Sequence, residues 1–337
     1  MAVSMGKLRG LQQVSTDEGI FAILACDQRG ALTRMMEKAG RAPVTYESIV
    51  QMKHDIVAPL APHASGVLLD PEYGAAQLIT RGALPGRVGL VVALEATGYE
   101  DREGDRLTRL LDNWSVAKIK AMGAAAVKLL VYYNPRREAA AARQRELVAQ
   151  VARECQAYDI PFMLEPVTYP SRDGDEEGFA REKPDLVVEA ARHFSEFSVD
   201  LLKMEFPLHP KAGDDPGLWQ EACQRLDEAC GVPWALLSAG VDFDTYCRQL
   251  EAACRAGASG FVAGRAIWRE AVELTDQQAR LEFLSRTMPA RIQRLGAIAA
   301  AHGRPWWERS SHAYSAADAP PDWYSRYPGF TDHALTP

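Results

Sequence analysis

Eight short apolar runs divide this chain of 337 residues, and amphipathic stretches lie between them. Each run has the length of a strand, whereas the stretches repeat apolar residues at helical spacing. Near-continuous apolar strands that alternate with helices indicate a parallel sheet covered by helices. The runs are residues 19–27, 65–70, 88–95, 125–133, 160–166, 199–206, 232–240 and 259–266.

Eight strand–helix units in a chain of this length favour an α/β fold of the TIM (β/α)8 barrel type, in a single domain over residues 1–303. An open three-layer sheet is the alternative. A dinucleotide-binding fold is disfavoured because no GxGxxG follows the first run. Residues 1–18 are expected to form a leading segment with a short helix. The clearest helical stretches are 109–122, 137–158, 185–197, 217–230 and 244–257.

The last part of the chain, residues 304–337, departs from this pattern because it is rich in proline, serine and aromatic residues. We predict an irregular C-terminal tail. Its three tryptophans, three tyrosines and one phenylalanine would be costly to expose. We therefore expect the tail to dock on this subunit or on a neighbouring copy, and we expect a homo-oligomer.

Composition narrows the class of protein. A net charge of −7 and a pI of about 5.6 argue against a dedicated nucleic-acid partner. The sequence contains no apolar run of about 18 residues, so no membrane span or membrane partner is expected, and its start lacks a signal-peptide core. The six cysteines show no CxxC spacing and are predicted to be small buried residues in a reducing cytoplasm.

Ionisable or hydrogen-bonding side chains stand at the ends of nearly all the predicted strands. A solvated strand end explains any one of them, but it does not explain a whole series. In a barrel the carboxyl ends of all strands meet on one rim, where barrel enzymes keep their active sites. The residues are Asp27, Asp70, Glu95, Lys128, Glu165, Lys203 with Glu205, Ser238 and Arg265.

Two of these residues, Lys128 and Lys203, lie inside apolar runs. Burial and a nearby cation both lower the pKa of a lysine, and a neutral amine attacks carbonyls. Glu165 suits general acid–base catalysis, because its apolar setting is expected to raise its pKa. Glu205 shares a strand face with Lys203, so it is either an ion-pair partner or a second proton-transfer group. The alternative is a purely structural ion pair of Lys203 with Glu205 or Glu165.

The last two strands end in small residues, in the segments LSAG (237–240) and AGRA (263–266). Small residues let backbone N–H groups approach a ligand closely, and the loops after strands seven and eight of this fold recurrently bind phosphate. Arg265 adds a cation. The seven histidines avoid the strand ends, so no metal site and no cofactor is predicted, and carbonyl activation would run through a lysine imine.

Longer motifs then point to a known family. In chain order, over roughly residues 5–300, the sequence resembles the tagatose 1,6-bisphosphate aldolase family. The resemblance is carried by ILACDQRGALTRMM (23–36), LLDPEYG (68–74), EATGY (95–99), AVKLLVYY (126–133), FMLEPVTY (162–169), LLKMEFP (201–207), LLSAGV (236–241) and AGRAIW (263–268).

The resemblance implies a class I, metal-independent lyase with a TIM barrel. Such an enzyme cleaves a ketohexose 1,6-bisphosphate to dihydroxyacetone phosphate and glyceraldehyde 3-phosphate. Lys203 matches the Schiff-base lysine, Glu165 the acid–base glutamate, and Lys128 a second active-site lysine. Asp27, Gln28, Ser238, Gly240, Gly264 and Arg265 match substrate-lining positions. The predicted substrate-binding set also includes Arg29, Glu205 and Ala239.

Two other functions stay open at this point. Sulfofructose-1-phosphate aldolases are similar in scaffold and keep the same catalytic set, but they hold a sulfonate where the other enzymes hold a phosphate. A non-catalytic sugar-phosphate-binding regulatory protein is the third possibility. Intact Lys203, Glu165 and Lys128 argue against it. The role of Lys128, whether a cation that tunes Lys203 or a group that holds a hydroxyl, is also left open.

Overall fold

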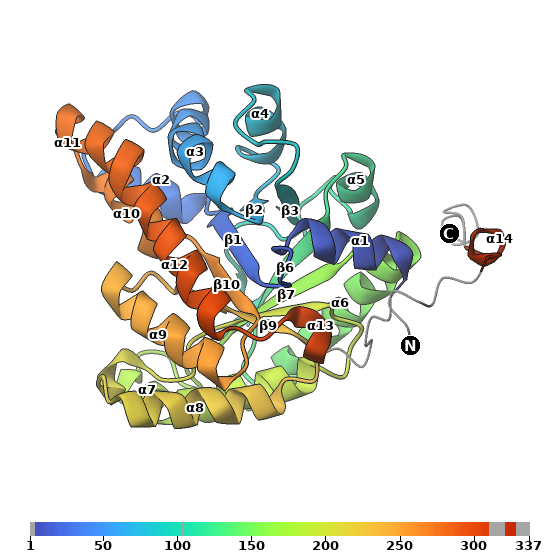
Figure 1. Ribbon diagram of the computed structural model, residues 1–337. Helices are drawn as coiled ribbons and strands as arrows, with labels where there is room; N and C mark the ends of the chain where they lie inside the picture. Colours follow the sequence, from blue (N-terminus) through green and yellow to red (C-terminus); the bar gives the residue numbers. More distant parts are fainter. Residues whose placement is uncertain (1–3, 103, 310–320, 328–337) are drawn as a thin grey trace.

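The eight apolar runs form the eight strands of a closed parallel barrel (Figure 1). The computed structural model describes residues 4–102, 104–309 and 321–327. Because β1 pairs in parallel with both β2 and β10, the barrel closes, and the TIM-barrel prediction is confirmed over the open sheet. The barrel strands are β1 (Phe21–Cys26), β2 (Gly66–Leu69), β3 (Gly89–Ala93), β6 (Ala126–Tyr132), β7 (Phe162–Val167), β8 (Leu201–Met204), β9 (Trp234–Leu237) and β10 (Gly260–Ala263).

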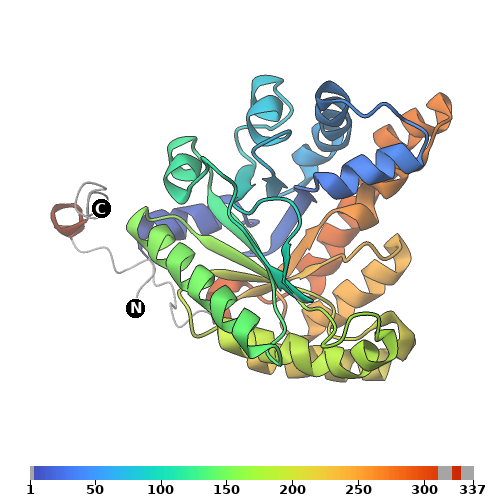
Figure 2. The same ribbon diagram turned by 180° about the vertical axis from the view of Figure 1, so that it is seen from behind.

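Helices surround the barrel, as the reverse view shows (Figure 2). Within the described residues, no helix is long and apolar enough to cross a membrane. The helices around the strands are α2 (Gly30–Lys38), α3 (Tyr46–Leu60), α4 (Ala75–Thr80), α5 (Val116–Ala121), α6 (Glu138–Ala157), α7 (Glu176–Phe194), α8 (Pro216–Ala229), α9 (Phe243–Ala256), α10 (Arg265–Glu273), α11 (Gln277–Glu282) and α12 (Met288–His302). Single turns lie at Ala61–His63 and Pro210–Ala212, and a π-helical turn at Phe283–Thr287 joins α11 to α12.

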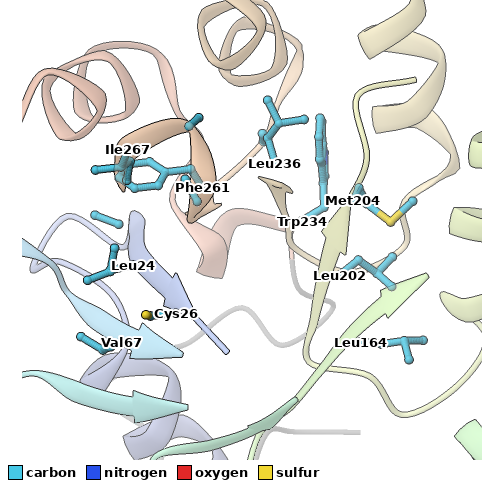
Figure 3. Packing of buried hydrophobic residues seen from close by; sticks show 14 of the residues in the cluster. Leu24, Cys26, Val67, Leu164, Leu202, Met204, Trp234, Leu236, Phe261 and Ile267 are labelled. Carbon is cyan, nitrogen blue, oxygen red and sulfur yellow. The ribbon is translucent and has the colours of Figure 1, made fainter. Parts of the chain in front are cut away.

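Strand alternation sorts side chains into two layers. Outward residues such as Leu24, Leu202 and Met204 pack under the helices, and Figure 3 shows part of this layer. All six cysteines are buried and free, as predicted. On several strands an inward apolar residue is followed, two residues later, by a charged one. In β8, for example, Leu201 belongs to the inner apolar cluster and Lys203 follows on the same face. The charges therefore gather at the carboxyl ends.

The opposite end of the barrel is closed by α1 (Met5–Gln13) and α13 (Trp306–Arg309), which lie at the same end of the molecule in Figure 1. Leu8, Leu11 and Trp306 join the inner apolar cluster, and the backbone N–H of Trp306 donates to the carbonyl of Gly19, just before β1. Trp306 is only 1% exposed. The expected docking of the tail on this subunit is confirmed at this residue.

Further along the tail, α14 (Trp323–Arg326) is a short helix that Figure 1 shows apart from the barrel. Tyr324 is exposed, and the hydroxyl of Tyr327 accepts a hydrogen bond from the Gly6 N–H at 3.0 Å. Tyr314 and Phe330, which belong to the predicted aromatic set, lie outside the described residues. Trp323 and Tyr324, the two aromatic residues of α14, are both exposed on this subunit.

Two helix predictions need correction, and one hairpin was missed. The helix expected at 109–122 begins only at Val116, because Ser115 caps it and Leu110 forms a bridge with Glu95 instead. The helix expected at 185–197 begins at Glu176, capped by Asp175, and continues through Pro184 to Phe194. A small antiparallel hairpin of β4 (Glu100–Arg102) and β5 (Asp105–Leu107) was not predicted, because strands of three residues give almost no alternation signal.

Candidate active site

Two lysines and a glutamate meet at the carboxyl ends of adjacent strands. Glu165 extends inward from β7, while Lys128 comes from β6 and Lys203 from β8. One carboxylate oxygen, Oε2 of Glu165, lies 2.9 Å from Nζ of Lys203 and 3.0 Å from Nζ of Lys128. The three side chains are nearly inaccessible to solvent. A single carboxylate oxygen therefore contacts both lysine side chains.

Lys128 sits in a cage of carboxylates. Its Nζ lies 2.9 Å from Oδ2 of Asp27 and 2.5 Å from Oε1 of Glu95, in addition to its contact with Glu165. Burial alone would lower the pKa of Lys128, but the attraction of these three carboxylates outweighs burial and raises its pKa well above the ordinary value. Lys128 is therefore protonated at neutral pH. That state suits a fixed cation and not a nucleophile.

The pKa values of the carboxylates of Glu165 and Asp27 are lowered, whereas that of Lys128 is raised. Burial would raise the pKa of Glu165, yet the charges of Lys128 and Lys203 outweigh that effect and lower its pKa. The prediction of a raised pKa for Glu165 is therefore wrong, since the sequence did not show that two cations would converge on it. Asp27 behaves alike: burial opposes its ionisation, but Lys128 and Lys203 lower its pKa. Both groups are carboxylates at neutral pH.

Two buried acceptor atoms near this cluster have no hydrogen-bond partner among the described residues. They are Oδ1 of Asp27 and Oε1 of Gln28, both in the loop that follows β1. A buried polar atom without a partner is costly in free energy, and native structures rarely keep one without a reason. Both acceptors would be satisfied by hydroxyl groups of a bound ligand.

Glu205 does not act as the sequence pattern suggested. Strand β8 ends at Met204, and one oxygen of Glu205 accepts hydrogen bonds from the N–H and the hydroxyl of Thr168, each at 2.7 Å. Its other oxygen lies 3.6 Å from Nζ of Lys183 on α7. Of the two ion-pair partners considered for Lys203, the described residues show Glu165 and not Glu205.

The ends of β9 and β10 form a separate corner with tight backbone turns. Ala239 and Gly240 both have left-handed backbone conformations, with φ of 44° and 80°. The hydroxyl of Ser238 lies 3.4 Å from the N–H of Gly264, at the amino end of α10. A Cβ at Gly264 would lie 2.5 Å from the carbonyl oxygen of Ala25, so only glycine allows this close approach.

Two arginines flank this corner. A Cβ on Gly240 would lie 3.0 Å from Nη2 of Arg269 and 3.2 Å from Cζ of Arg265, so both guanidinium groups border the turn. Burial and the neighbouring Arg269 lower the pKa of Arg265. Neither arginine has an acidic partner within ion-pair distance among the residues described. Two uncompensated cations beside a helix amino terminus suit a dianion such as phosphate.

Arg29, predicted to bind substrate, is held by protein groups. Its Nη1 lies 2.6 Å from Oε2 of Glu72, and its Nη2 donates to the backbone carbonyl of Glu95 at 2.7 Å. The guanidinium group is mostly buried. These contacts connect the loops that follow β1, β2 and β3.

Sequence reasoning missed three residues in this region. Glu95 appeared in the strand-end series but not in the predicted site. Arg269 follows Arg265 by four residues, a spacing that places both on one helix face. Lys53 stands in the apolar stripe of α3, four residues after Ile49, where a charged residue is itself a signal.

No cluster of three or more histidine, cysteine or acidic side chains suited to holding a metal ion is found in the described ranges. The carboxylates of Asp27, Glu95 and Glu165 instead converge on the ammonium group of Lys128.

Comparison with known proteins identifies the scaffold. A family model described as DeoC/LacD family aldolase matches residues 21–270. The chain belongs to the DeoC/LacD aldolase family. Tagatose 1,6-diphosphate aldolases of Staphylococcus aureus strains JH9 and Newman are each 37% identical to it over 328 residues, which cover 92% of this chain and 100% of each relative. This DeoC/LacD member is thus an aldolase, a lyase that makes or breaks a carbon–carbon bond.

Solved structures agree on the fold of this family member. A Schiff base forming fructose-1,6-bisphosphate aldolase matches with a TM-score of 0.56 at 20% identity, over 82% of this chain and 96% of that one. The fructose-bisphosphate aldolase of Plasmodium falciparum matches with a TM-score of 0.69 at 13% identity, over 90% and 98% of the two chains. At such low identities these matches establish the barrel and no more.

Proposed function

We propose that this aldolase cleaves a ketohexose 1,6-bisphosphate, with tagatose 1,6-bisphosphate as the first candidate, to dihydroxyacetone phosphate and glyceraldehyde 3-phosphate. The whole-length similarity to tagatose 1,6-diphosphate aldolases supports the substrate class. The arrangement of Lys203, Glu165 and Lys128 supports the chemistry, because it offers one lysine nucleophile beside one ionised carboxylate and one fixed cation.

Lys203 is the imine former in this proposal. Lys128 is surrounded by three carboxylates and stays protonated, whereas among the described residues Lys203 has Glu165 as its one acidic partner. The deprotonated amine of Lys203 adds to the C2 carbonyl of the ketose. The carbinolamine takes up a proton and loses water to give an iminium ion. Glu165 lies beside this new cation and stabilises it.

Cleavage then uses Glu165 as the base. Its carboxylate takes the proton of the C4 hydroxyl, the C3–C4 bond breaks, and the electron pair moves into the iminium to give an enamine. The aldehyde leaves. Protonation of the enamine at C3 restores the iminium, and water releases dihydroxyacetone phosphate and the free amine. Lys128 contributes by keeping Glu165 and Asp27 ionised.

Substrate binding follows from the remaining groups. Ser238, Ala239, Gly240 and Gly264, together with Arg265 and Arg269, are proposed to hold one phosphate at the amino end of α10. Asp27 and Gln28 are proposed to accept hydrogen bonds from sugar hydroxyls through their unpartnered oxygens. Arg29 and Glu205 are proposed to shape the surrounding wall through their protein contacts.

Borohydride trapping tests the imine. Reduction in the presence of dihydroxyacetone phosphate should attach one three-carbon phosphate group to Lys203, as located by peptide mass spectrometry. The variant Lys203→Met should show no adduct. An adduct on Lys128 alone, or none on the wild-type enzyme, would refute the proposal.

Substrate range and metal dependence need separate measurements. Rates with tagatose 1,6-bisphosphate, fructose 1,6-bisphosphate and sulfofructose 1-phosphate should rank tagatose 1,6-bisphosphate first. A preference for sulfofructose 1-phosphate would place the enzyme with the sulfonate-binding aldolases. Activity should survive a chelator, and its loss on chelation with recovery on adding a divalent metal would contradict the metal-independent imine route.

Two properties of the protein in the cell complete the proposal. We expect a cytoplasmic enzyme, because all six cysteines are free and buried, as is usual in a reducing compartment. We also expect a homo-oligomer, because Trp323 and Tyr324 of α14 are exposed on the single chain. Light scattering of the full chain would contradict the second expectation if it gave the mass of a monomer.

A further inference from the structure

Lys203, Glu165, Lys128 and Asp27 form the catalytic cluster of the proposed reaction. A lysine outside this cluster is as deeply buried as Lys128. Lys53 projects from α3, on the outside of the barrel, and its side chain is fully shielded from solvent. Its neighbours along the helix face are apolar, including Ile49 and Ile56. Lysine is almost never buried in this way unless its charge is fully used.

This ammonium group donates two hydrogen bonds to backbone carbonyls and makes one ion pair. Nζ of Lys53 lies 2.5 Å from the carbonyl oxygen of Cys26, 2.8 Å from that of Gln28, and 2.7 Å from Oδ2 of Asp70. The two carbonyls stand on either side of Asp27. A single buried cation thus holds the backbone immediately before and after a residue of the catalytic cluster.

Asp70 extends this contact to a second loop. Its other oxygen, Oδ1, accepts hydrogen bonds from the backbone N–H groups of Glu72 and Tyr73 at 3.0 and 2.8 Å. Glu72 in turn pairs with Arg29. The pair of Lys53 and Asp70 therefore ties the loop after β1 to the turn after β2.

The consequence for the catalytic cluster runs through Asp27. Its Oδ2 lies 2.9 Å from Nζ of Lys128, and Lys128 contacts Glu165. Burial alone would lower the pKa of Lys53, but Asp70 and, more weakly, Asp27 raise it, so Lys53 remains a cation. A displacement of about 1 Å in a catalytic group can lower a rate about 100-fold. The backbone at Asp27 is where such a displacement would begin.

We propose that Lys53 is a positioning residue, which holds Asp27 in place against Lys128 and so keeps the Lys128–Glu165 contact in its catalytic geometry. The effect on catalysis rests on the proposed cleavage reaction, whereas the effect on the position of Asp27 does not. It assigns to a residue of the outer helix layer a part in the chemistry of the inner rim.

A contribution to stability alone is the competing explanation, and the chain offers a matched control. Lys7 on α1 is also buried and pairs with Asp200 at 2.7 Å, but it lies at the opposite end of the barrel. Lys7→Met and Lys53→Met should both lower the melting temperature. Only Lys53→Met should lower kcat, by about 100-fold, while Lys7→Met should keep kcat within about twofold of the wild type.

Two further variants separate position from stability. Lys53→Met/Asp70→Leu replaces the buried ion pair by apolar groups, a change that is often neutral or stabilising. Because leucine also removes the acceptor of the Glu72 and Tyr73 N–H groups, the double variant should regain only part of the melting temperature, and it should not regain kcat. In an Asp27→Asn background, Lys53→Met should cost little further kcat, because both changes act through the same group. A folded Lys53→Met/Asp70→Leu enzyme with wild-type kcat would overturn the proposal.

A crystal structure of Lys53→Met/Asp70→Leu supplies a test that does not need activity. The distance from the carboxylate of Asp27 to Nζ of Lys128 should increase beyond hydrogen-bond range, and an unchanged distance would also overturn the proposal. If the wild-type enzyme cleaved none of the ketose phosphates, the proposed function would fail on its own, and this structure would still decide the role of Lys53.

Discussion

Replacing Glu165 by glutamine tests which carboxylate transfers the proton. The amide keeps the shape of the side chain but loses the charge that lies 2.9 Å from Lys203 and 3.0 Å from Lys128. At an effective dielectric constant of about 20, two opposite unit charges about 3 Å apart attract each other by about 5 kcal/mol. The amide dipole recovers part of this attraction toward the iminium, but it cannot take a proton from the C4 hydroxyl.

Loss of a positioned general base usually costs about 100- to 10,000-fold in rate, which corresponds to about 3–5 kcal/mol of barrier. We therefore expect Glu165→Gln to lower kcat by that factor. Because the nucleophile is still present, borohydride should still trap dihydroxyacetone phosphate on Lys203. This combination of trapping without turnover would locate the defect in proton transfer.

Glu205→Gln is the matched control, since Glu205 is also a buried glutamate at the same rim. Its carboxylate accepts two hydrogen bonds from Thr168 and has no contact with Lys203 within the described structure. We expect a loss of about 1–3 kcal/mol in the free energy of unfolding and a kcat within about tenfold of the wild type. Steady-state kinetics beside urea unfolding would measure both. A larger loss of kcat in Glu205→Gln than in Glu165→Gln would contradict the assignment of Glu165 as the base.

Other expected outcomes test separate parts of the structure. Arg265→Met and Arg269→Met should each raise KM for the bisphosphate about 10- to 100-fold, since each removes a charged hydrogen-bond donor, and an unchanged KM would exclude that arginine from the phosphate site. The lowered pKa values of Asp27 and Glu165 add stability that is present above about pH 4 and lost as the pH falls below it; urea unfolding at pH 6 and pH 3 should show the fall, and a smaller one in Asp27→Asn. Trp306→Ala should lower the free energy of unfolding by about 3–5 kcal/mol without changing kcat, because Trp306 lies at the other end of the barrel, and a lost kcat in the folded variant would contradict that separation.

Much of the fold could be predicted from the sequence, because its signal is repeated. Eight apolar runs of strand length strongly favour a barrel. Seven of them contain the strand that the structure shows, and β7 extends one residue beyond the run at 160–166. Boundaries were less predictable. Pro184 stands inside α7, although a proline usually marks a helix end. The helix begins at its Asp175 cap, and among residues 176–184 only Lys183 is buried. This first part of the helix therefore gives no apolar stripe from which it could be predicted.

In the candidate site, too, some features could be predicted from the sequence and others could not. The strand-end series pointed to Lys128, Glu165 and Lys203, because charged residues at the end of an apolar run need a reason to be there. It could not show which carboxylate each lysine would contact. Alternation along one strand placed Glu205 on the same face as Lys203, and the sequence left Glu205 and Glu165 open as partners of that lysine. Glu165, on the adjacent strand, makes the contact.

Local periodicity in the sequence was enough to predict the barrel, the rim that carries the candidate site and most of the groups on that rim. The protonation states of these groups depend on the tertiary structure. Glu165 is ionised because two lysines from neighbouring strands converge on it, and Lys128 is protonated because three carboxylates surround it. Electrostatic energy depends on distances between side chains that are far apart in the chain. Lys53, buried in the outer layer with its charge directed at the loop of Asp27, shows the same dependence.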